Sequence, residues 1–293
     1  MKKYDSIGEL LVDFRKLHKL SQADLAAKLD VDIRTIQRWE NGTTLIKPDK
    51  EADIIRETLL PYQLVRNLNG SIPIPTFYDF SLRKYSSSDI HFDLPGANWF
   101  KEHMNRATDR VRSLDYVRDM DTLASYMRLH KEISGSLREV IREAARLLPG
   151  MNLVVLDDSG FYSGHSLIFP IRYGAYEKLR SRQMTEEELR TEDLVDPKLV
   201  ERPIFYGYDI TADCNDNMYY LVGTLLRALQ GLPNAYYIYC ATPYRYDSFR
   251  LNKQLGLKII WEEPRKKNSY GMEVAPRFQE GNFRDFLTEE QSS

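Results

Sequence analysis

The sequence predicts an α+β protein of several domains, with an all-α head, a helical linker and a mixed α/β C-terminal domain. Three observations predict this class. The 293 residues exceed the roughly 100–200 of an ordinary domain. The first 60 residues repeat apolar side chains at helical spacing, and after Pro149-Gly150 the pattern changes to strands alternating with helices. We expect a head at 1–62, a connector and helical segment at 63–150, an α/β domain at 151–276 and a tail at 277–293.

Four helices are predicted in the head. Apolar residues spaced three and four apart form the first amphipathic face. Ser21 and Asp32 are N-caps for the second and third helices. Asn41-Gly42 tolerates the positive φ that ends a helix, and Pro61 stops the fourth. The helices are expected at 7–20, Gln22–Leu29, Ile33–Glu40 and 48–60.

The rest of the chain divides into a connector and two patterned regions. Residues 61–96 contain prolines and serines and at most one short strand, Thr76–Phe80. Residues 97–148 are helical, with a break at Ser134-Gly135-Ser136. The strands of the α/β domain are expected at Asn152–Asp157, Gly164–Ile171, Pro203–Thr211, Ala235–Ala241 and Leu257–Trp261, and its helices at Tyr173–Leu189, Met218–Leu229 and Tyr246–Leu255.

Composition excludes several classes of protein. Hydrophobic residues make up 42% and aromatic residues 12% of the chain, enough to form packed cores rather than a disordered chain. No apolar run approaches the ~18 residues that cross a membrane, and the N-terminus has no apolar core of a secretory signal. Two cysteines, Cys214 and Cys240, form neither a disulfide framework nor a structural zinc site. We expect a cytoplasmic protein without a metal.

The charge balance limits non-specific binding of nucleic acid. The net charge is −2, and the first 60 residues contain 11 basic and 11 acidic side chains. Such a balance of charges argues against a protein that binds non-specifically along a polyanion such as nucleic acid. It is compatible with a small reading head that uses a few well-placed arginines.

The strongest motif is Leu20-Ser21-Gln22-Ala23-Asp24-Leu25-Ala26 followed by Val31-Asp32-Ile33-Arg34-Thr35-Ile36-Gln37-Arg38-Trp39-Glu40-Asn41-Gly42. Over residues 4–60 the chain resembles the helix-turn-helix of the XRE family, the phage repressor and Cro-like regulators. Small Ala26 lets two helices cross closely, and the three-residue link Asp30–Asp32 turns the chain sharply. The resemblance implies that the helix beginning at Ile33 lies in the major groove of DNA.

Exposed side chains of that helix are expected to read base edges, although a merely solvated helix face would show the same pattern. Arg34 and Arg38 can each donate two parallel hydrogen bonds to guanine O6 and N7, and Thr35 can contact a thymine methyl. Gln37 belongs to the same exposed set. The resemblance places three further side chains at the phosphates, namely Gln22, Asn41 and Thr43.

The resemblance also implies an ion pair between Arg15 and Glu40 that joins the first and third helices. The alternative is two exposed charges on separate helices. Removing one partner of a buried pair costs roughly 3–5 kcal/mol, because the other charge stays buried. Glu40→Ala is therefore expected to unfold the head.

Residues 151–276 resemble the GNAT acetyltransferase fold. The order of the predicted elements carries the likeness, together with Leu255-Gly256-Leu257, where Leu257 stands for the family's phenylalanine. The resemblance implies a loop before the central helix whose backbone N–H groups wrap the pyrophosphate of acetyl-CoA.

Three departures from the family pattern disfavour acetyl-CoA as a cofactor. In the segment just before Leu225-Leu226, Tyr220 and Val222 stand where the family has two small residues, and Asn217 stands where it has an arginine. Asn252 stands in place of the tyrosine that serves as the family's acid. The domain is therefore expected to be degenerate, used for ligand sensing or self-association.

No other residue set predicts a catalytic or metal site. Tyr244 and Tyr246 are candidate acids and Cys214 a candidate nucleophile, but none has a base at a diagnostic spacing. The tyrosine-rich stretches favour core packing, with a planar or apolar ligand as the alternative. The histidines show no metal-ligand spacing: His18, His91, His103, His130 and His165.

The first hypothesis is a sequence-specific transcriptional regulator that binds double-stranded DNA as a homodimer. The alternative is an active acetyl-CoA-dependent N-acetyltransferase targeted by its helix-turn-helix. A third reading makes the head an antitoxin-like module that binds protein.

Overall fold

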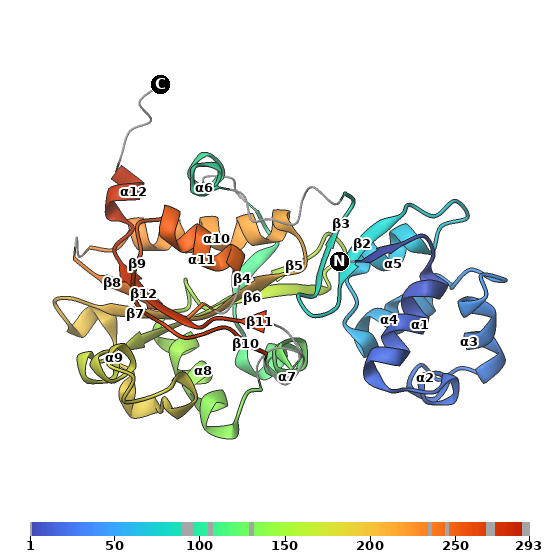
Figure 1. Ribbon diagram of the computed structural model, residues 1–293, viewed down its shortest axis with the longest axis horizontal. Helices are drawn as coiled ribbons and strands as arrows, with labels where there is room; N and C mark the ends of the chain where they lie inside the picture. The colour runs from blue at the N-terminus through green and yellow to red at the C-terminus, as the bar shows by residue number, and fades with distance from the viewer. Residues whose placement is uncertain are drawn as a thin grey trace. The chain divides into compact units, whose positions relative to one another are not determined.

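The computed structural model describes residues 2–88, 96–104, 108–128, 132–233, 236–243, 246–267 and 273–288. Their contacts divide the chain into two compact units, Met1–Phe92 and Asp93–Ser293. The predicted α+β class is confirmed, with helices in the first unit and a large mixed sheet in the second (Figure 1).

The N-terminal unit combines a set of short helices with a small antiparallel sheet in the strand order β1-β2-β3. The helices are α1 (Ile7–His18), α2 (Gln22–Lys28), α3 (Ile33–Glu40), α4 (Pro48–Thr58) and α5 (Tyr62–Leu68). The strands are β1 (Lys2–Tyr4), β2 (Thr76–Asp79) and β3 (Lys84–Ser86).

The predicted caps of α2 and α3 are present. The Ser21 hydroxyl accepts from the Asp24 N–H while the Asp24 carboxylate accepts from the Ser21 N–H, which makes a capping box. The Asp32 carboxylate accepts from the Arg34 N–H at 2.7 Å. Short side chains that bond the free N–H groups of a first turn fix where these helices begin.

The predicted boundary of the head at residue 62 is wrong, because α5, β2 and β3 belong to the same compact unit as α1 to α4. Strand β1 pairs with β2, with Lys2 opposite Tyr78 and Tyr4 opposite Thr76. Of these strands only β2 was expected, within Thr76–Phe80, so the prediction of an all-α head is wrong. Strands β1 and β3 have three residues each, too few for periodicity to detect, and β1 lies far from its partner β2 in the sequence.

The C-terminal unit is built on a seven-stranded sheet with helices on both faces. Its strands are β4 (Val111–Ser113), β5 (Leu153–Leu156), β6 (Tyr162–Ile171), β7 (Ile204–Ala212), β8 (Ile238–Ala241), β9 (Lys258–Glu262) and β12 (Arg277–Gly281), with a separate pair β10 (Lys266–Lys267) and β11 (Glu273–Val274). Its helices are α6 (Ala97–His103), α7 (Tyr116–Met127), α8 (Gly135–Leu147), α9 (Tyr173–Arg180), α10 (Asn215–Gln230), α11 (Tyr246–Gln254) and α12 (Arg284–Thr288), with 3-10 turns at Glu186–Glu188, Thr191–Asp193 and Pro197–Leu199.

The sheet has the strand order β4-β5-β6-β7-β8-β12-β9. Neighbouring strands are antiparallel except β7 and β8, which run parallel. The parallel pairing joins Ile204–Gly207 to Ile238–Ala241 and ends there, although β7 continues to Ala212. The last part of β7 therefore has β6 as its partner and not β8.

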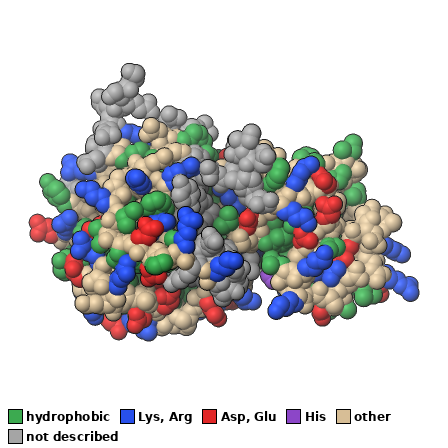
Figure 2. All heavy atoms as spheres, viewed as in Figure 1, with side chains coloured by type: hydrophobic (Ala, Val, Ile, Leu, Met, Phe, Trp, Pro, Cys, Tyr) green, Lys and Arg blue, Asp and Glu red, His purple; other side chains and the backbone are tan. Residues whose placement is uncertain are grey.

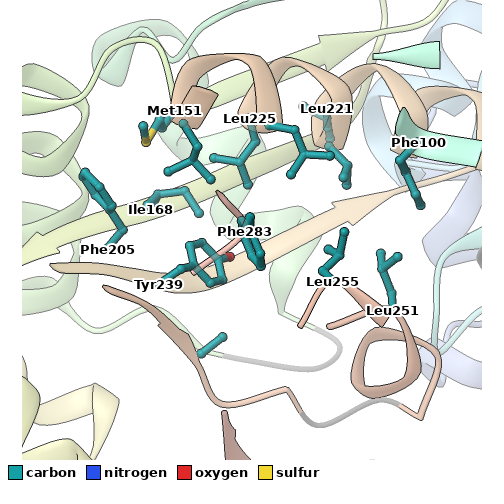
Figure 3. Close-up of a cluster of buried hydrophobic side chains, with 14 of the residues drawn as sticks. Phe100, Met151, Ile168, Phe205, Leu221, Leu225, Tyr239, Leu251, Leu255 and Phe283 are labelled. Atoms are coloured by element: carbon teal, nitrogen blue, oxygen red, sulfur yellow. The ribbon is translucent and has the colours of Figure 1, made fainter. Parts of the chain in front are cut away.

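Two cores fill the layers on either side of the sheet. One core lies under α6, α10 and α11 and runs from Phe100 and Leu251 at one end, past Leu221, to Ile168 and Phe205 of the sheet at the other (Figure 3). The other lies under α7, α8 and α9. Alternate residues of β6 and β7 face opposite cores, as the period of two of a strand requires.

Several predicted boundaries in this unit are wrong. Strand β4 lies within the segment 97–148 that was expected to be helical, and β12 and α12 lie within the expected tail 277–293. The helix expected at Tyr173–Leu189 ends at Arg180. The helix expected from Met218 begins at Asn215. No helix among the described residues is long and apolar enough to cross a membrane.

Candidate nucleic-acid interface

Helices α2 and α3 are joined by a tight turn. Asp30 adopts a left-handed backbone conformation with φ of 50°, and the Val31 N–H donates to the Ala26 carbonyl at 3.0 Å. Leu25, Ala26 and Ile36 are buried where the helices meet. This packing fixes the angle between α2 and α3 and leaves the opposite side of α3 exposed.

Arg15 and Glu40 form an ion pair inside this unit. Arg15 Nε and Nη2 donate to Glu40 Oε1 and Oε2 at 2.5 and 2.8 Å, and Nη1 donates to the Leu20 carbonyl at 3.1 Å. The side chains are only 15% and 4% exposed. The hydrogen bonds that Arg15 donates to the Glu40 carboxylate raise the pKa of Arg15 above its usual value. The pair therefore joins α1 to the end of α3 in a low-dielectric setting.

The pair extends to the exposed side of α3 through two glutamines. Gln22 Nε2 donates to Glu40 Oε2 at 2.7 Å, and Gln37 Nε2 donates to Gln22 Oε1 at 3.4 Å. Gln22 is half-buried and Gln37 is exposed. The Gln22 side chain, expected from the sequence to meet phosphate, thus has partners within the protein.

The exposed side of α3 carries Arg34, Gln37 and Arg38, with Thr35 half-buried beside them. In the part of the chain that the structure describes, the guanidinium groups of Arg34 and Arg38 have no ion pair or hydrogen bond. Lys and Arg side chains project where Figure 1 draws α3 (Figure 2). Two solvent-facing cations are thus held on a short helix whose other side is buried.

The loop after α3 contains the two residues expected at a neighbouring phosphate. Gly42 has φ of 66° and ends the helix. The Thr43 N–H and hydroxyl both donate to the Arg38 carbonyl, at 2.9 and 3.1 Å. Asn41 and Thr43 are exposed. The sequence did not single out Ile33, the first residue of α3, which is 40% exposed.

A comparison with protein-family models matches residues 11–50 to a family described as Helix-turn-helix. The N-terminal unit contains a helix-turn-helix. The matched residues cover α2 and α3 and most of α1, so the helix-turn-helix is the part of this chain that supports DNA binding. No curated protein matches the chain.

The second candidate site, expected at Asn217–Val222 in the C-terminal unit, is not a loop. These residues lie within α10, which Cys214 precedes as the N-cap. The Asp213 carboxylate lies just before this helix and is buried. Asn217 Nδ2 donates to Asp213 Oδ1 at 3.1 Å and to Ser163 Oγ at 2.5 Å. A side-chain carboxylate of the protein thus lies where the helix N-terminus attracts anions.

Arg110 covers the first turns of α10. Its guanidinium lies 5.4 Å from the centre of the half-buried Tyr220 ring, and Nη1 donates to Asn217 Oδ1 at 3.4 Å. Nη2 pairs with the Asp158 carboxylate. Arg110 is therefore already neutralised by an exposed carboxylate, and Tyr220 lies beneath it.

The other candidate catalytic residues do not assemble into a catalytic group. Asn252 Nδ2 donates to Gln279 Oε1 at 3.2 Å. Cys214, the candidate nucleophile, is half-buried at the N-cap of α10. The other cysteine, Cys240, is fully buried, and this burial raises the pKa of its thiol. Among the described residues, no three His, Cys, Asp or Glu side chains could hold a metal ion. Tyr244, His91 and His130 lie outside the described residues, and nothing is described of the Tyr246 and His103 side chains.

The two described histidines have structural surroundings. His165 is fully buried, with Nδ1 at 2.6 Å from the Tyr162 hydroxyl and Nε2 at 2.8 Å from Asp209 Oδ2. The His18 ring packs on Phe14 with ring centres 4.4 Å apart. Neither belongs to a metal-ligand set.

Asp213 makes the stability of this unit depend on pH. Burial raises its pKa to about 6, whereas an unfolded Asp titrates near pH ~3.9. Folding therefore takes up a proton between about pH 4 and 6, and the free energy of unfolding falls as pH rises through this window. Asp213→Asn is expected to remove this slope and to stabilise the C-terminal unit by about 1–3 kcal/mol at pH 7.

Urea unfolding of the C-terminal unit between pH 4 and 7.5 measures this effect. The exposed Asp216, on the first turn of the same helix, provides the control, because Asp216→Asn is expected to keep the wild-type slope. An Asp213→Asn protein that loses stability with rising pH as steeply as the wild type would contradict the assignment.

The C-terminal part is similar to solved N-acetyltransferase structures. A polyamine N-acetyltransferase of Drosophila melanogaster is 12% identical, with 59% of this chain and 98% of that chain covered and a TM-score of 0.41. A mosquito protein named arylalkylamine N-acetyltransferase like 5b is 13% identical over 59% and 98% of the two chains, with a TM-score of 0.38. A ribosomal-protein-alanine N-acetyltransferase of Brucella melitensis is 12% identical over 59% and 98%, with a TM-score of 0.35.

Proposed function

We propose that this protein is a sequence-specific DNA-binding transcriptional regulator with an XRE-type helix-turn-helix. The observation that carries the proposal is the pair of solvent-facing guanidinium groups of Arg34 and Arg38 on α3, a helix held to α1 by the Arg15–Glu40 ion pair. A helix anchored by a buried pair presents its exposed side chains in a fixed geometry, as base recognition requires.

In this proposal α3 enters the major groove with its N-terminal half leading. Arg34 and Arg38 each recognise a guanine through O6 and N7, and Gln37 has the amide chemistry that recognises adenine. Asn41 and Thr43 contact a phosphate, which fixes register and carries no sequence information. Because few cations take part, the affinity of one head is expected to depend weakly on salt.

The C-terminal unit is proposed to sense a ligand or to hold two copies of the chain together, not to transfer acetyl groups. Two paired heads would read half-sites one helical turn of DNA apart, about 34 Å. A ligand that favours one spacing of the heads over another would change the affinity for such a site.

Selection of bound fragments from random duplex DNA tests the proposal. The expected result is a palindromic consensus with guanines in each half-site and a complex of two chains per duplex. Recovery of fragments without any consensus would overturn the proposed function. A consensus bound by a single chain would remove the homodimer and leave sequence-specific binding in place.

An acetyl-CoA-dependent N-acetyltransferase is the second candidate, and the end of the parallel pairing at Gly207 and Ala241, beyond which β7 continues without β8, favours it. Ligands of α/β proteins bind at the carboxyl ends of parallel strands. Against it, the carboxylate of Asp213 lies at the N-terminus of α10, where it repels a diphosphate, and Tyr220 lies below Arg110.

We therefore expect calorimetry to detect no micromolar binding of CoA, and a thiol-release assay with acetyl-CoA to show no turnover. A working acetyltransferase whose diphosphate site is known is the positive control for both assays. Binding of CoA in the micromolar range would favour the enzyme and would show that the α10 N-terminus accepts phosphate.

A further inference from the structure

An exposed aliphatic side chain stands at the start of the proposed reading helix. Ile33 is the first residue of α3 and is 40% exposed, whereas Ile36 and Trp39 of the same helix are 0% and 4% exposed. Ile33 is thus not part of the core that holds α3 in place. It adjoins Arg34 in sequence and lies one turn before Gln37, on the same side of the helix.

The position of Ile33 is fixed from two directions. The Asp32 carboxylate caps the helix by accepting from the Arg34 N–H at 2.7 Å, and the Asp32 carbonyl accepts from the Thr35 N–H at 2.8 Å. A branched Cβ restricts the side chain of Ile33 to few rotamers. An apolar group held in this way loses little entropy when it contacts a ligand.

The amide beside Ile33 is also held in place. The Gln37 side chain donates to Gln22, and Gln22 donates to Glu40 of the buried ion pair with Arg15. The hydrogen bond to Gln22 uses one of the two Nε2 hydrogens of Gln37, so Oε1 and the other hydrogen remain for a base. Ile33 and Gln37 therefore form a patch that is half apolar and half amide.

Thymine carries the C5-methyl group, which is the apolar feature of base edges in the major groove, and adenine offers N7 and N6–H₂ to an amide. We propose that Ile33 reads thymine by packing on its C5-methyl group, next to an adenine read by Gln37. This inference rests on the proposed function. It assigns the thymine contact to Ile33 instead of Thr35, which is half-buried on another side of the helix.

Replacing thymine by uracil tests the proposal, because it removes only the C5-methyl group. Each thymine of the selected site is replaced in turn by deoxyuridine, and the Kd of the full-length protein is measured. At one thymine in each half-site, the wild type is expected to lose roughly 3- to 10-fold in affinity. Ile33→Ala is expected to bind the unmodified site as weakly as the wild type binds the uracil site, with no further loss on uracil.

Leu17→Ala is the matched control, since Leu17 is an exposed aliphatic residue on α1, 49% exposed. It is expected to keep the wild-type sensitivity to uracil. Ile33→Val retains a branched aliphatic group and is expected to keep most of the sensitivity, which separates the methyl contact from a general disturbance of α3.

The two possible failures are distinguishable. If random duplex DNA yields no consensus, the proposed function fails and this inference fails with it. If a consensus exists but the wild type and Ile33→Ala respond equally to every uracil substitution, the inference alone is overturned. A uracil effect that disappears in Thr35→Ala and persists in Ile33→Ala would return the thymine contact to Thr35.

Discussion

Replacing Glu40 by alanine is expected to unfold the N-terminal unit under conditions in which the C-terminal unit stays folded. The change leaves the Arg15 guanidinium, whose side chain is 15% exposed, without its carboxylate and removes the partner of Gln22. Loss of one partner from a buried pair costs roughly 3–5 kcal/mol. Since a whole domain has only about 5–15 kcal/mol of stability, this loss is enough to populate the unfolded head.

Hydrogen exchange of the full-length chain measures the loss region by region. Amides of α1, α2 and α3 are expected to lose protection in Glu40→Ala, while those of α8 and β6 keep it. Glu57→Ala is the matched control: Glu57 pairs with Lys28 at 3.0 Å, and both side chains are well exposed, at 45% and 39%. An exposed pair contributes at most about 1 kcal/mol. Equal protection in the two variants would show that the Arg15–Glu40 pair does not hold the head together.

Arg34→Ala and Arg38→Ala are each expected to weaken binding to the selected DNA site by roughly 5- to 150-fold, or about 1–3 kcal/mol. Each guanidinium is exposed and without an internal partner among the described residues, so its removal changes recognition without stranding a charge in the protein. The preference for guanine is expected to relax at one position per half-site, a different one for each arginine.

Arg142→Ala makes the same change of charge on α8 of the other unit, at an exposed arginine that pairs with Glu139, and it is expected to leave affinity unchanged. Kd values at two salt concentrations separate base reading from attraction to phosphate, because a base contact alters sequence preference and a phosphate contact alters the salt slope. If both arginine variants bind as tightly as the wild type, α3 does not read DNA. The head would then be better described as a module that binds protein.

Much of the helix-turn-helix was predictable because its determinants are local. The capping box of Ser21 and Asp24, the cap at Asp32 and the glycine after α3 act within four residues of their partners. The apolar period then selects the buried side of each helix, so the exposure of Arg34 and Arg38 followed from the pattern. Ile33, the proposed thymine contact, was not predicted, because an apolar residue beside buried positions is expected in the core and only the packing of the head leaves it 40% exposed.

The start of α10 shows where local rules fail. Cys214 caps the helix without a side-chain hydrogen bond, so no capping residue marks Asn215 as the first turn. The buried carboxylate of Asp213 depends on Ser163 and Asn217, and Ser163 comes from a strand about fifty residues earlier. No pattern in the neighbouring sequence predicts that a carboxylate is buried there, since burial of a charge depends on partners supplied by other elements.

Strands β4 and β12 were missed for a related reason. Val111–Ser113 is a strand because β5 is its partner, and Arg277–Gly281 lies between β8 and β9, which precede it in the sequence. Three to five residues contain too little alternation to reveal a strand, and the hydrogen bonds that define it are made to distant segments.

Local sequence was therefore sufficient for the first four helices of the head and for which of their sides are exposed, although not for α5. It was also sufficient for the alternation of strands and helices in the second unit, because caps and periodicity act over a few residues. The resemblance already implied the Arg15–Glu40 pair, but only the tertiary structure joined Gln22 and Gln37 to it, buried Asp213 at the start of α10 and set the order of the strands. These features depend on contacts between residues far apart in the chain, and their energies come from burial and from exclusion of water, which exist only after the chain has folded.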